Sequence, residues 1–598
     1  MSMHKEPACK SRASEDVIYH FKQKYTMNFK DTNIKGLLDN SIQYSIPVYQ
    51  RAYSWKEDNW KVFISDLLEQ VGRENEYSYG NLLLETIERE TSYEVIDGQQ
   101  RLTTIIIFMR SLYNALKEQG EEKNILDDIK ELFFERKSKH RIQTVDNDCA
   151  CFDAVIIANS NYTASSESQK NIIEAKNFFA KELSKMSLEK LRQLYNLVLK
   201  SKINRIELEG KKEAALMFEL QNNRGRDLTN LEKLKSFFMY QMYVNSPADE
   251  TDGNVECISN YFKDIYAAAY AVKGISEDNI LIYHCNAYLH VAFGYKNLED
   301  IKKELNEQSD KIAWMKDFSR NLSFTFANLK TLQLTCTCPY YQKLQRIRKQ
   351  EGFAYFVYPF IIKGYKYFQG DNTQLDKLFR VLEILAFRYH LISSRADIGT
   401  RLSEIIRNFN GDLWNFKCLI DLKLNSEYHW SYTRMKDVLS GYMYGNTALH
   451  YLLWEYEESI QPKGYKIGSI VIDNEQIEHI SPQTPTDGYA LESGYEVDEH
   501  GQYTEEFVKI HLNCIGNLML ISGTHNASIG NVKFTEKLNS YKQSPLLKQQ
   551  SEISSFVNNE IPEWTHVHIE ERKKKILDFA FKRWNLNDVD IQGDNALF

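Results

Sequence analysis

Hydrophobic residues recur every three or four positions through most of this 598-residue chain, which predicts a mainly helical protein. Clear examples are the periodic stretches 60–68, 105–112, 353–368 and 378–392. Short β-branched runs interrupt the helical pattern near both ends, at 77–87, 93–96 and 201–209, and a further short strand is expected to end at Glu478-His479. We therefore expect a multidomain, mainly α protein with α+β ends, divided at about 1–240, 241–430 and 431–598, the middle part being a helical bundle that serves as a spacer.

Composition and charge narrow the class of protein. Hydrophobic residues make up 43% of the chain and the formal net charge is −8, so we expect a globular protein that does not coat nucleic acid indiscriminately. Local basic segments at 136–141, 343–349 and 572–575 still allow a nucleic-acid groove. The nine cysteines include no Cys-x-x-Cys pair, and no apolar run approaches the length needed to cross a membrane. These features favour a soluble protein of the cytoplasm.

The segment 92–104, SYEVIDGQQRLTT, carries the first candidate chemistry. A predicted strand, Tyr93 to Ile96, breaks at Asp97-Gly98, and a helix is expected to begin directly afterwards. The start of a helix offers unpaired N–H groups and a partial positive charge to a phosphate, and glycine allows close approach of the backbone. The amides of Gln99 and Gln100 and the guanidinium of Arg101 would add contacts, while Asp97 would hold a metal or orient a water. The alternative is a helix cap in which Asp97 accepts backbone N–H groups.

A second candidate site lies in the segments IEHISP and GNLMLISGTHN, at 477–482 and 516–526. The order Glu478-His479, Asn517, Asn526 resembles the ββα-metal nuclease motif, commonly called HNH. The resemblance implies that His479 is the general base and that Asn517 fixes the loop that orients it. It also implies that Glu478 and Asn526 are metal ligands.

The residue types suit phosphodiester hydrolysis. A neutral histidine can activate a water near neutral pH, and hard oxygen ligands favour Mg²⁺ or Mn²⁺ over zinc. His525 and, more weakly, His511 are competing ligands. The alternative is a buried structural histidine accompanied by two asparagine turns.

Taken together, both ends of the chain resemble GmrSD-type type IV restriction endonucleases. The N-terminal part is similar to their ParB/sulfiredoxin-like domain at Tyr49–Arg51, Asp97–Arg101 and the segment 218–235, and the C-terminal part to their HNH-type nuclease domain. The resemblance implies that a nucleoside triphosphate, GTP or ATP, is bound and hydrolysed at Asp97–Arg101. It also brings Gln50, Arg51 and Arg224 to the same pocket.

The resemblance implies a modification-dependent DNA endonuclease of anti-phage defence. Its DNA would carry glucosylated hydroxymethylcytosine or a phosphorothioate backbone, and Lys537, Arg572 and Lys573 would contact phosphates. One alternative is a nucleotide-gated, ParB-like DNA-binding protein whose C-terminal domain is only a scaffold. Another is a toxin that cuts RNA with the same HNH centre. Whether the chain forms a homo-oligomer stays open.

Overall fold

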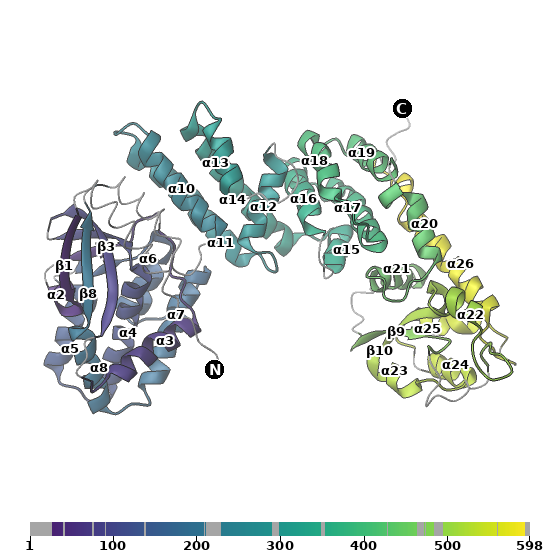
Figure 1. Ribbon diagram of the computed structural model, residues 1–598, viewed down its shortest axis with the longest axis horizontal. Coiled ribbons are helices and arrows are strands. Elements are labelled where there is room, and N and C mark those ends of the chain that lie inside the picture. Colours follow the sequence, from purple (N-terminus) through teal and green to yellow (C-terminus); the bar gives the residue numbers. More distant parts are fainter. Residues whose placement is uncertain are drawn as a thin grey trace, which may run out of the picture. The chain divides into compact units, whose positions relative to one another are not determined.

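A computed structural model describes most of the chain, and every structural statement concerns the described residues alone. The described residues are 27–39, 42–48, 50–73, 77–89, 91–136, 139–208, 210, 229–289, 298–348, 353–426, 428–462, 472, 474–483, 494–543, 545–558 and 560–591. They fall into two compact units (Figure 1). Unit 1 comprises residues 1–281 and 297–330, and unit 2 comprises residues 282–296 and 331–598. The boundaries of the three expected domains stay a prediction.

Unit 1 contains a six-stranded mixed sheet with the strand order β1-β8-β3-β4-β2-β7. The strands are β1 Met27–Asn33, β2 Gln43–Ser45, β3 Ser78–Glu88, β4 Ser92–Asp97, β7 Ile142–Gln143 and β8 Lys202–Leu208. β3 pairs antiparallel with β4 and parallel with β8, while β2 lies parallel to β4. A separate two-stranded ribbon is formed by β5 Glu135–Arg136 and β6 Lys139–His140. The strands predicted from the pattern at 77–87, 93–96 and 201–209 are confirmed as β3, β4 and β8.

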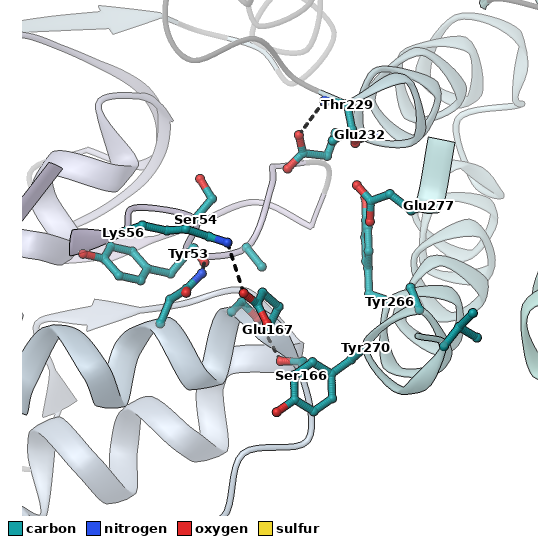
Figure 2. Close-up of a pocket in the computed structure, with 15 residues that line it drawn as sticks. Tyr53, Ser54, Lys56, Ser166, Glu167, Thr229, Glu232, Tyr266, Tyr270 and Glu277 are labelled. Carbon is teal, nitrogen blue, oxygen red and sulfur yellow. Dashed lines mark hydrogen bonds and ion pairs between the residues drawn. The ribbon is translucent and has the colours of Figure 1, made fainter. Parts of the chain in front are cut away.

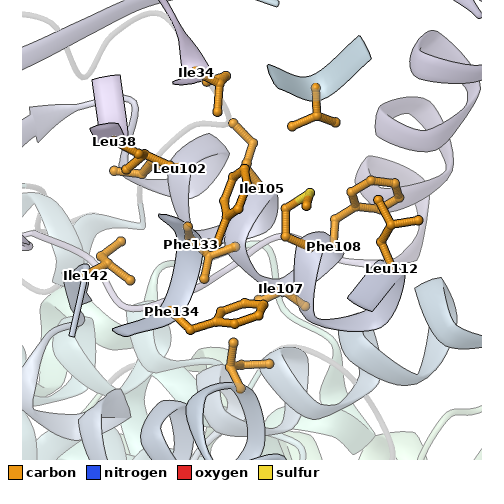
Figure 3. Packing of buried hydrophobic residues seen from close by; sticks show 14 of the residues in the cluster. Ile34, Leu38, Leu102, Ile105, Ile107, Phe108, Leu112, Phe133, Phe134 and Ile142 are labelled. Atoms are coloured by element: carbon orange, nitrogen blue, oxygen red, sulfur yellow. The ribbon is translucent and has the colours of Figure 1, made fainter. Parts of the chain in front are cut away.

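Helix α4, Gln99–Glu118, is the central helix of this unit. Its side chains are buried on nearly every face because it packs between sheet residues and α7 and α8. Figure 3 shows part of this core, a cluster to which Ile105 and Phe108 of α4, Phe133 and Ile142 belong. The helices of unit 1 are α2 Ile34–Asp39, α3 Glu57–Gln70, α4, α5 Lys123–Ile129, α6 Asp146–Phe152, α7 Glu167–Leu183, α8 Leu188–Lys200, α10 Asn230–Asn245, α11 Thr251–Ala271 and α13 Leu298–Asn306, with π-helical turns at Lys130–Phe134 and Asp153–Ile157.

The described residues of unit 2 are mainly helical and include a two-stranded antiparallel sheet, β9 Glu475–His479 with β10 Leu518–Ser522. Helices α12 Glu277–Tyr288 and α14 Lys311–Thr335 contain the points at which the chain passes between the units. The other helices are α15 Pro339–Arg348, α16 Ala354–Phe368, α17 Asn372–Ile392, α18 Ile398–Asn408, α19 Leu413–Asn425, α20 Tyr432–Ser440, α21 Leu449–Ile460, α22 Glu505–Phe507, α23 Gly523–Ile529, α24 Phe534–Gln543, α25 Lys548–Ser551 and α26 His566–Arg583. Short turns lie at Tyr428–Trp430, Val508–Leu512, Ile515–Asn517, Glu552–Ser555 and Leu586–Asp588.

A buried carboxylate ties the aromatic helices of unit 2 to its C-terminal helix. Glu383 of α17 has no exposed surface, and it accepts hydrogen bonds from Tyr451 (2.7 Å), Trp584 (2.8 Å) and Arg583 (2.9 Å). A buried charge requires such partners, since an unpaired carboxylate is costly to desolvate. Helices α17, α21 and α26 are therefore fixed to one another.

The predicted fold class, mainly α with α+β ends, is confirmed. Thr229 and Glu232 form a capping box at the start of α10, because each residue accepts the backbone N–H of the other, at 3.2 and 2.9 Å. Helix α3 begins after Lys56, whose N–H donates to Asn59 Oδ1 (3.1 Å). The N–H of Ser54 donates to a side chain of α4.

Candidate functional site

Strand β9, helix α23 and the residues that directly follow each of them surround a cavity of about 360 Å³ in unit 2. Antiparallel pairing places His479 opposite Leu518, so the residues just before β10 lie beside the end of β9. Glu478, His479 and Asn526 all line this cavity. Residues that are far apart in the sequence are thus brought together by one strand pair and the helix that follows it.

His479 is held by two neighbours. Its Nε2 lies 3.1 Å from Asn513 Oδ1, and its ring packs edge-on against Tyr444 at 4.5 Å between ring centroids. Burial lowers the pKa of His479 to about 4, and Lys537 adds to this effect, while the bond to Asn513 opposes it. The imidazole is therefore neutral near pH 7, which is the form a general base requires.

Glu478 is buried and already has partners. Its Oε1 accepts hydrogen bonds from the ammonium of Lys537 (2.6 Å) and the hydroxyl of Tyr541 (2.8 Å), both on α24. Lys537 is 1% exposed at its side chain and also donates to the carbonyl of His479 (2.9 Å). Lys537 also lines the cavity, but its ammonium is nearly buried and is bound to Glu478 and the end of β9, so the phosphate contact expected for it stays a prediction.

Asn526 lines the cavity, whereas the two competing histidines do not. Nδ2 of Asn526 donates to Gln476 Oε1 (2.7 Å), which leaves the side-chain oxygen Oδ1 of Asn526 available. The ring of His525 contacts Ser540 at 2.8 Å and Gln550 at 3.3 Å, and it is not among the residues that line the cavity. His511 pairs with Glu570 (3.1 Å) and is also outside the cavity lining.

Asn517 is completely buried and fixes the segments on either side of the cavity. Its Oδ1 accepts the N–H of Ser481 (2.8 Å), and its Nδ2 donates to the carbonyls of Ser481 (3.1 Å) and Leu512 (2.8 Å). The preceding Gly516 lies against α26, where an added Cβ would be 2.2 Å from the carbonyl oxygen of Ile569. The Gly-Asn pair therefore combines close backbone packing with a fully hydrogen-bonded amide.

The phosphate contacts expected for Arg572 and Lys573 do not fit the structure. Arg572 has no exposed surface, and its guanidinium donates to the carbonyls of Gly516 (2.9 Å) and Leu518 (2.8 Å). Lys573 is buried and donates to Glu570 (3.0 Å). Arg572 and Lys573 lie on the buried face of α26, together with Ile569 and Ile576.

The strand–glycine–helix arrangement predicted at Asp97–Arg101 is present in unit 1. Gly98 lies between β4 and α4 with φ of +93°, a conformation that favours glycine. The first N–H groups of α4 follow it directly, as a phosphate seat requires. Asp97 is exposed, and among the described residues its side chain has no hydrogen-bond partner.

Gly98→Ala is expected to destabilise unit 1 by about 1–3 kcal/mol. The positive φ strains an L-residue, and the new Cβ would lie 2.9 Å from Leu82 Cδ1. Urea unfolding monitored by circular dichroism measures the change. Gly253→Ala in α11 is the control, since a Cβ there meets no atom within 4 Å and should leave stability unchanged or slightly raised. Equal stability of the Gly98 variant and the wild type would contradict the predicted strain.

Three polar residues of this region bind the protein's own backbone. Gln100 accepts the N–H of Ser54 (2.9 Å) and donates to the carbonyl of Ala52 (3.1 Å). Arg101 donates to the carbonyls of Tyr79 and Asn81 on β3, the latter at 2.8 Å. Gln50 donates to the carbonyls of Val95 and Ile96 on β4. The direct phosphate grip expected of Gln100 and Arg101 therefore does not fit, because these side chains brace neighbouring segments.

The other residues expected at this site are Gln99, Arg51 and Arg224. Gln99 is buried at the start of α4, and within the described chain its side chain has no hydrogen-bond partner. Arg51 is partly exposed and follows Gln50, whose side chain reaches β4. Arg224 lies outside the described residues. Gln50 bonds to Val95 and Ile96, directly before the segment 97–101, and its role in nucleotide binding stays a prediction.

A pocket of about 370 Å³ lies beside the segment that Gln100 braces (Figure 2). It is bounded by the residues before α3, by the first residues of α7 and α10, and by Tyr266 and Tyr270 of α11. Glu167, Glu232 and Glu277 also line it, and Lys56 pairs with Glu167 at 3.2 Å. The pocket therefore combines the starts of three helices with acidic and aromatic side chains, and Gln100 holds one of its walls.

Two family models match the chain, one at each end. The N-terminal domain of GmrSD restriction endonucleases matches residues 34–239, and the C-terminal domain matches residues 429–579. Together they cover more than half of the chain, in the order found here, so this protein is a type IV restriction endonuclease and DNA is its partner. The chain belongs to the GmrSD restriction endonuclease family, which confirms the resemblance seen in the sequence.

A search of the curated proteins found no match. Within the described residues, none of the helices has both the length and the apolar character needed to cross a membrane.

Proposed function

We propose that this restriction endonuclease cuts modified DNA by an HNH-type, one-metal mechanism in unit 2. The observation that carries the proposal is the single cavity lined by His479, Glu478 and Asn526. It combines a neutral imidazole with two oxygen-bearing side chains, which are the groups that metal-assisted hydrolysis of a phosphodiester requires. The bonds of Asn517 to the flanking segments support an orienting role for that residue.

In the proposed reaction His479 activates a water molecule. The ring nitrogen that does not contact Asn513 accepts a proton from the water. The water oxygen forms a bond to phosphorus, and the bond from phosphorus to the leaving sugar oxygen breaks. Holding the ring against Asn513 and Tyr444 limits its rotation, which lowers the entropic cost of reaching the reactive geometry.

The donor set of the cavity fits a hard divalent cation. Glu478 Oε1 already accepts hydrogen bonds from Lys537 and Tyr541. Glu478 Oε2 and the side-chain oxygen Oδ1 of Asn526 would therefore hold Mg²⁺ or Mn²⁺, with water completing the coordination. The bound ion would supply stabilisation of negative charge on the phosphate. Lys537 reduces the net charge of the site, which favours a weakly held, exchangeable ion.

Plasmid nicking by the wild-type protein tests this function. The substrates are unmodified, glucosylated-hydroxymethylcytosine and phosphorothioate DNA, each with Mg²⁺, Mn²⁺ or EDTA and with or without GTP or ATP. We expect cutting of one modified substrate that EDTA abolishes. Equal cutting of unmodified DNA would contradict modification dependence, and cleavage of RNA alone would favour the toxin. Nucleotide hydrolysis without any cutting would favour the gated DNA-binding protein.

We further propose that unit 1 binds and hydrolyses a nucleoside triphosphate at the start of α4. Support comes from the positive φ of Gly98, the exposed carboxylate of Asp97 and the buried amide of Gln99 beside the helix N-terminus. Gln100 and Arg101 would act through the segments that they brace rather than by direct contact with phosphate.

Asp97→Asn is therefore expected to lower nucleotide hydrolysis by about 10²-fold or more, without a change in melting temperature. The side chain is exposed and bonds to no described residue, so the fold does not depend on its charge. Release of inorganic phosphate from GTP and ATP measures the effect. Glu88→Gln, an exposed carboxylate at the end of β3, is the matched control. Unchanged hydrolysis by the Asp97 variant would remove Asp97 from the site.

A further inference from the structure

Asn513 contacts the imidazole of His479 from a position that the sequence motif does not mark. It lies just before the turn Ile515–Asn517 and is partly buried. Its Oδ1 is 3.1 Å from His479 Nε2. We propose that Asn513 is a positioning residue for His479: it accepts the Nε2–H bond and so leaves Nδ1 as the nitrogen that carries the lone pair. This inference rests on the proposed role of His479.

The chemistry of the two groups determines which ring nitrogen carries the proton. An amide oxygen only accepts hydrogen bonds, so the ring nitrogen facing it must carry hydrogen. A neutral imidazole has one N–H, and fixing it at Nε2 leaves Nδ1 unprotonated. The amide of Gln483 also directs its Nε2 toward the same oxygen, at 3.5 Å, which is consistent with an acceptor at that position.

Asn513 is itself held in place from both sides. Its backbone carbonyl accepts the N–H groups of Met443 (2.9 Å) and Tyr444 (3.3 Å). The carbonyl of the preceding Leu512 accepts Nδ2 of Asn517 (2.8 Å). Asn513 is thus fixed between the segment that carries Tyr444 and the loop that Asn517 secures.

This arrangement gives the buried Asn517 a route to the reacting histidine. The side chain of Asn517 holds Leu512, and the next residue, Asn513, holds the ring of His479. Tyr444 packs against the same ring at 4.5 Å, so the imidazole is confined by an amide on one edge and an aromatic ring on another. The loop secured by Asn517 therefore sets both the orientation and the tautomer of His479.

A pair of matched variants tests the proposal. Asn513→Leu keeps the approximate volume but removes the acceptor, whereas Asn513→Asp keeps an acceptor oxygen in the same place. At pH 8 and saturating Mg²⁺, we expect the leucine variant to lose about 10²-fold in kcat for nicking with little change in KM. The aspartate variant should retain most of the wild-type kcat. Leucine and aspartate variants that are equally impaired, or a leucine variant with wild-type kcat, would overturn the proposal.

A spectroscopic measurement distinguishes this proposal from a failure of the proposed function. The full-length protein is labelled with ¹⁵N in the histidine rings, and the His479 signals are assigned from their absence in His479→Ala. We expect a protonated Nε2 and an unprotonated Nδ1 in the wild type, and a mixture of tautomers in Asn513→Leu. An Nδ1–H tautomer in the wild type would overturn the proposal. The spectrum does not depend on DNA cleavage, so it remains decisive even if His479 proves dispensable for cutting.

Discussion

His479→Ala is expected to lower the rate of DNA nicking by about 10²–10⁴-fold. The substitution removes the proposed general base, and the fold loses only one side-chain hydrogen bond and one ring contact. We therefore expect the variant to remain folded and to bind DNA like the wild type. Single-turnover nicking at saturating protein measures the chemical step apart from binding, and a melting curve checks the fold.

His525→Ala is the matched control for this prediction. His525 lies close to Asn526 in the sequence and was a competing ligand on that basis. Its ring contacts Ser540 and Gln550 and does not line the cavity. We expect its single-turnover nicking rate to stay within about threefold of the wild type, far smaller than the loss of a catalytic group. Loss of cutting in the His525 variant together with wild-type cutting by His479→Ala would reverse the assignment.

The order of motifs in the C-terminal part predicted the residues of the cavity well. A strand that ends in Glu478-His479, followed after a long loop by Asn517 and a short helix with Asn526, was enough to place three of these side chains in one cavity. The pattern could not show that Glu478 is already paired with Lys537, because the two residues meet only when α24 packs beneath β9. Sequence spacing identifies which elements carry the chemistry, but the contacts between elements depend on tertiary packing.

Asn513 shows a second limit of sequence analysis. It lies four residues before Asn517 in HLNCIGN, and no feature of composition or periodicity distinguishes it from any other polar loop residue. Its role depends on the bonds that fix its backbone to the segment before α21, which is distant in the sequence. Asn513 is far from His479 in the sequence, and only the fold brings its amide to the imidazole ring.

In the N-terminal part, local structure was more predictable than side-chain function. The strand ending at Asp97, the glycine and the long helix follow from nearest-neighbour preferences. Arg101 and Gln100 appeared free to bind a phosphate because the sequence does not reveal where unpaired carbonyl groups of other strands lie. In the fold, the backbone carbonyls of Tyr79, Asn81 and Ala52 accept hydrogen bonds from these two side chains.

The buried guanidinium of Arg572 has the largest expected effect on stability. Its Nη1 bonds to the carbonyls of Gly516 and Leu518, at the point where the chain enters β10, and its Nε lies 3.4 Å from Glu552 Oε1. Arg572→Met keeps much of the side-chain length but removes every donor. Glu552 and the carbonyl groups would then remain buried with fewer partners, which is costly in a region of low dielectric.

Arg572→Met is therefore expected to lower the free energy of unfolding of unit 2 by about 3–5 kcal/mol. Chemical denaturation measures the loss, and Lys574→Met, an exposed cation on the same helix, should unfold like the wild type. If Arg572 contacted DNA instead, its replacement would leave stability nearly unchanged and reduce the salt dependence of DNA binding by about one phosphate contact. Measuring both quantities on the same variant separates the two roles. A stable Arg572→Met protein with weakened, less salt-dependent binding would restore the phosphate contact, whereas an unstable one would confirm that this charge holds the Gly516-Asn517 turn beneath the cavity.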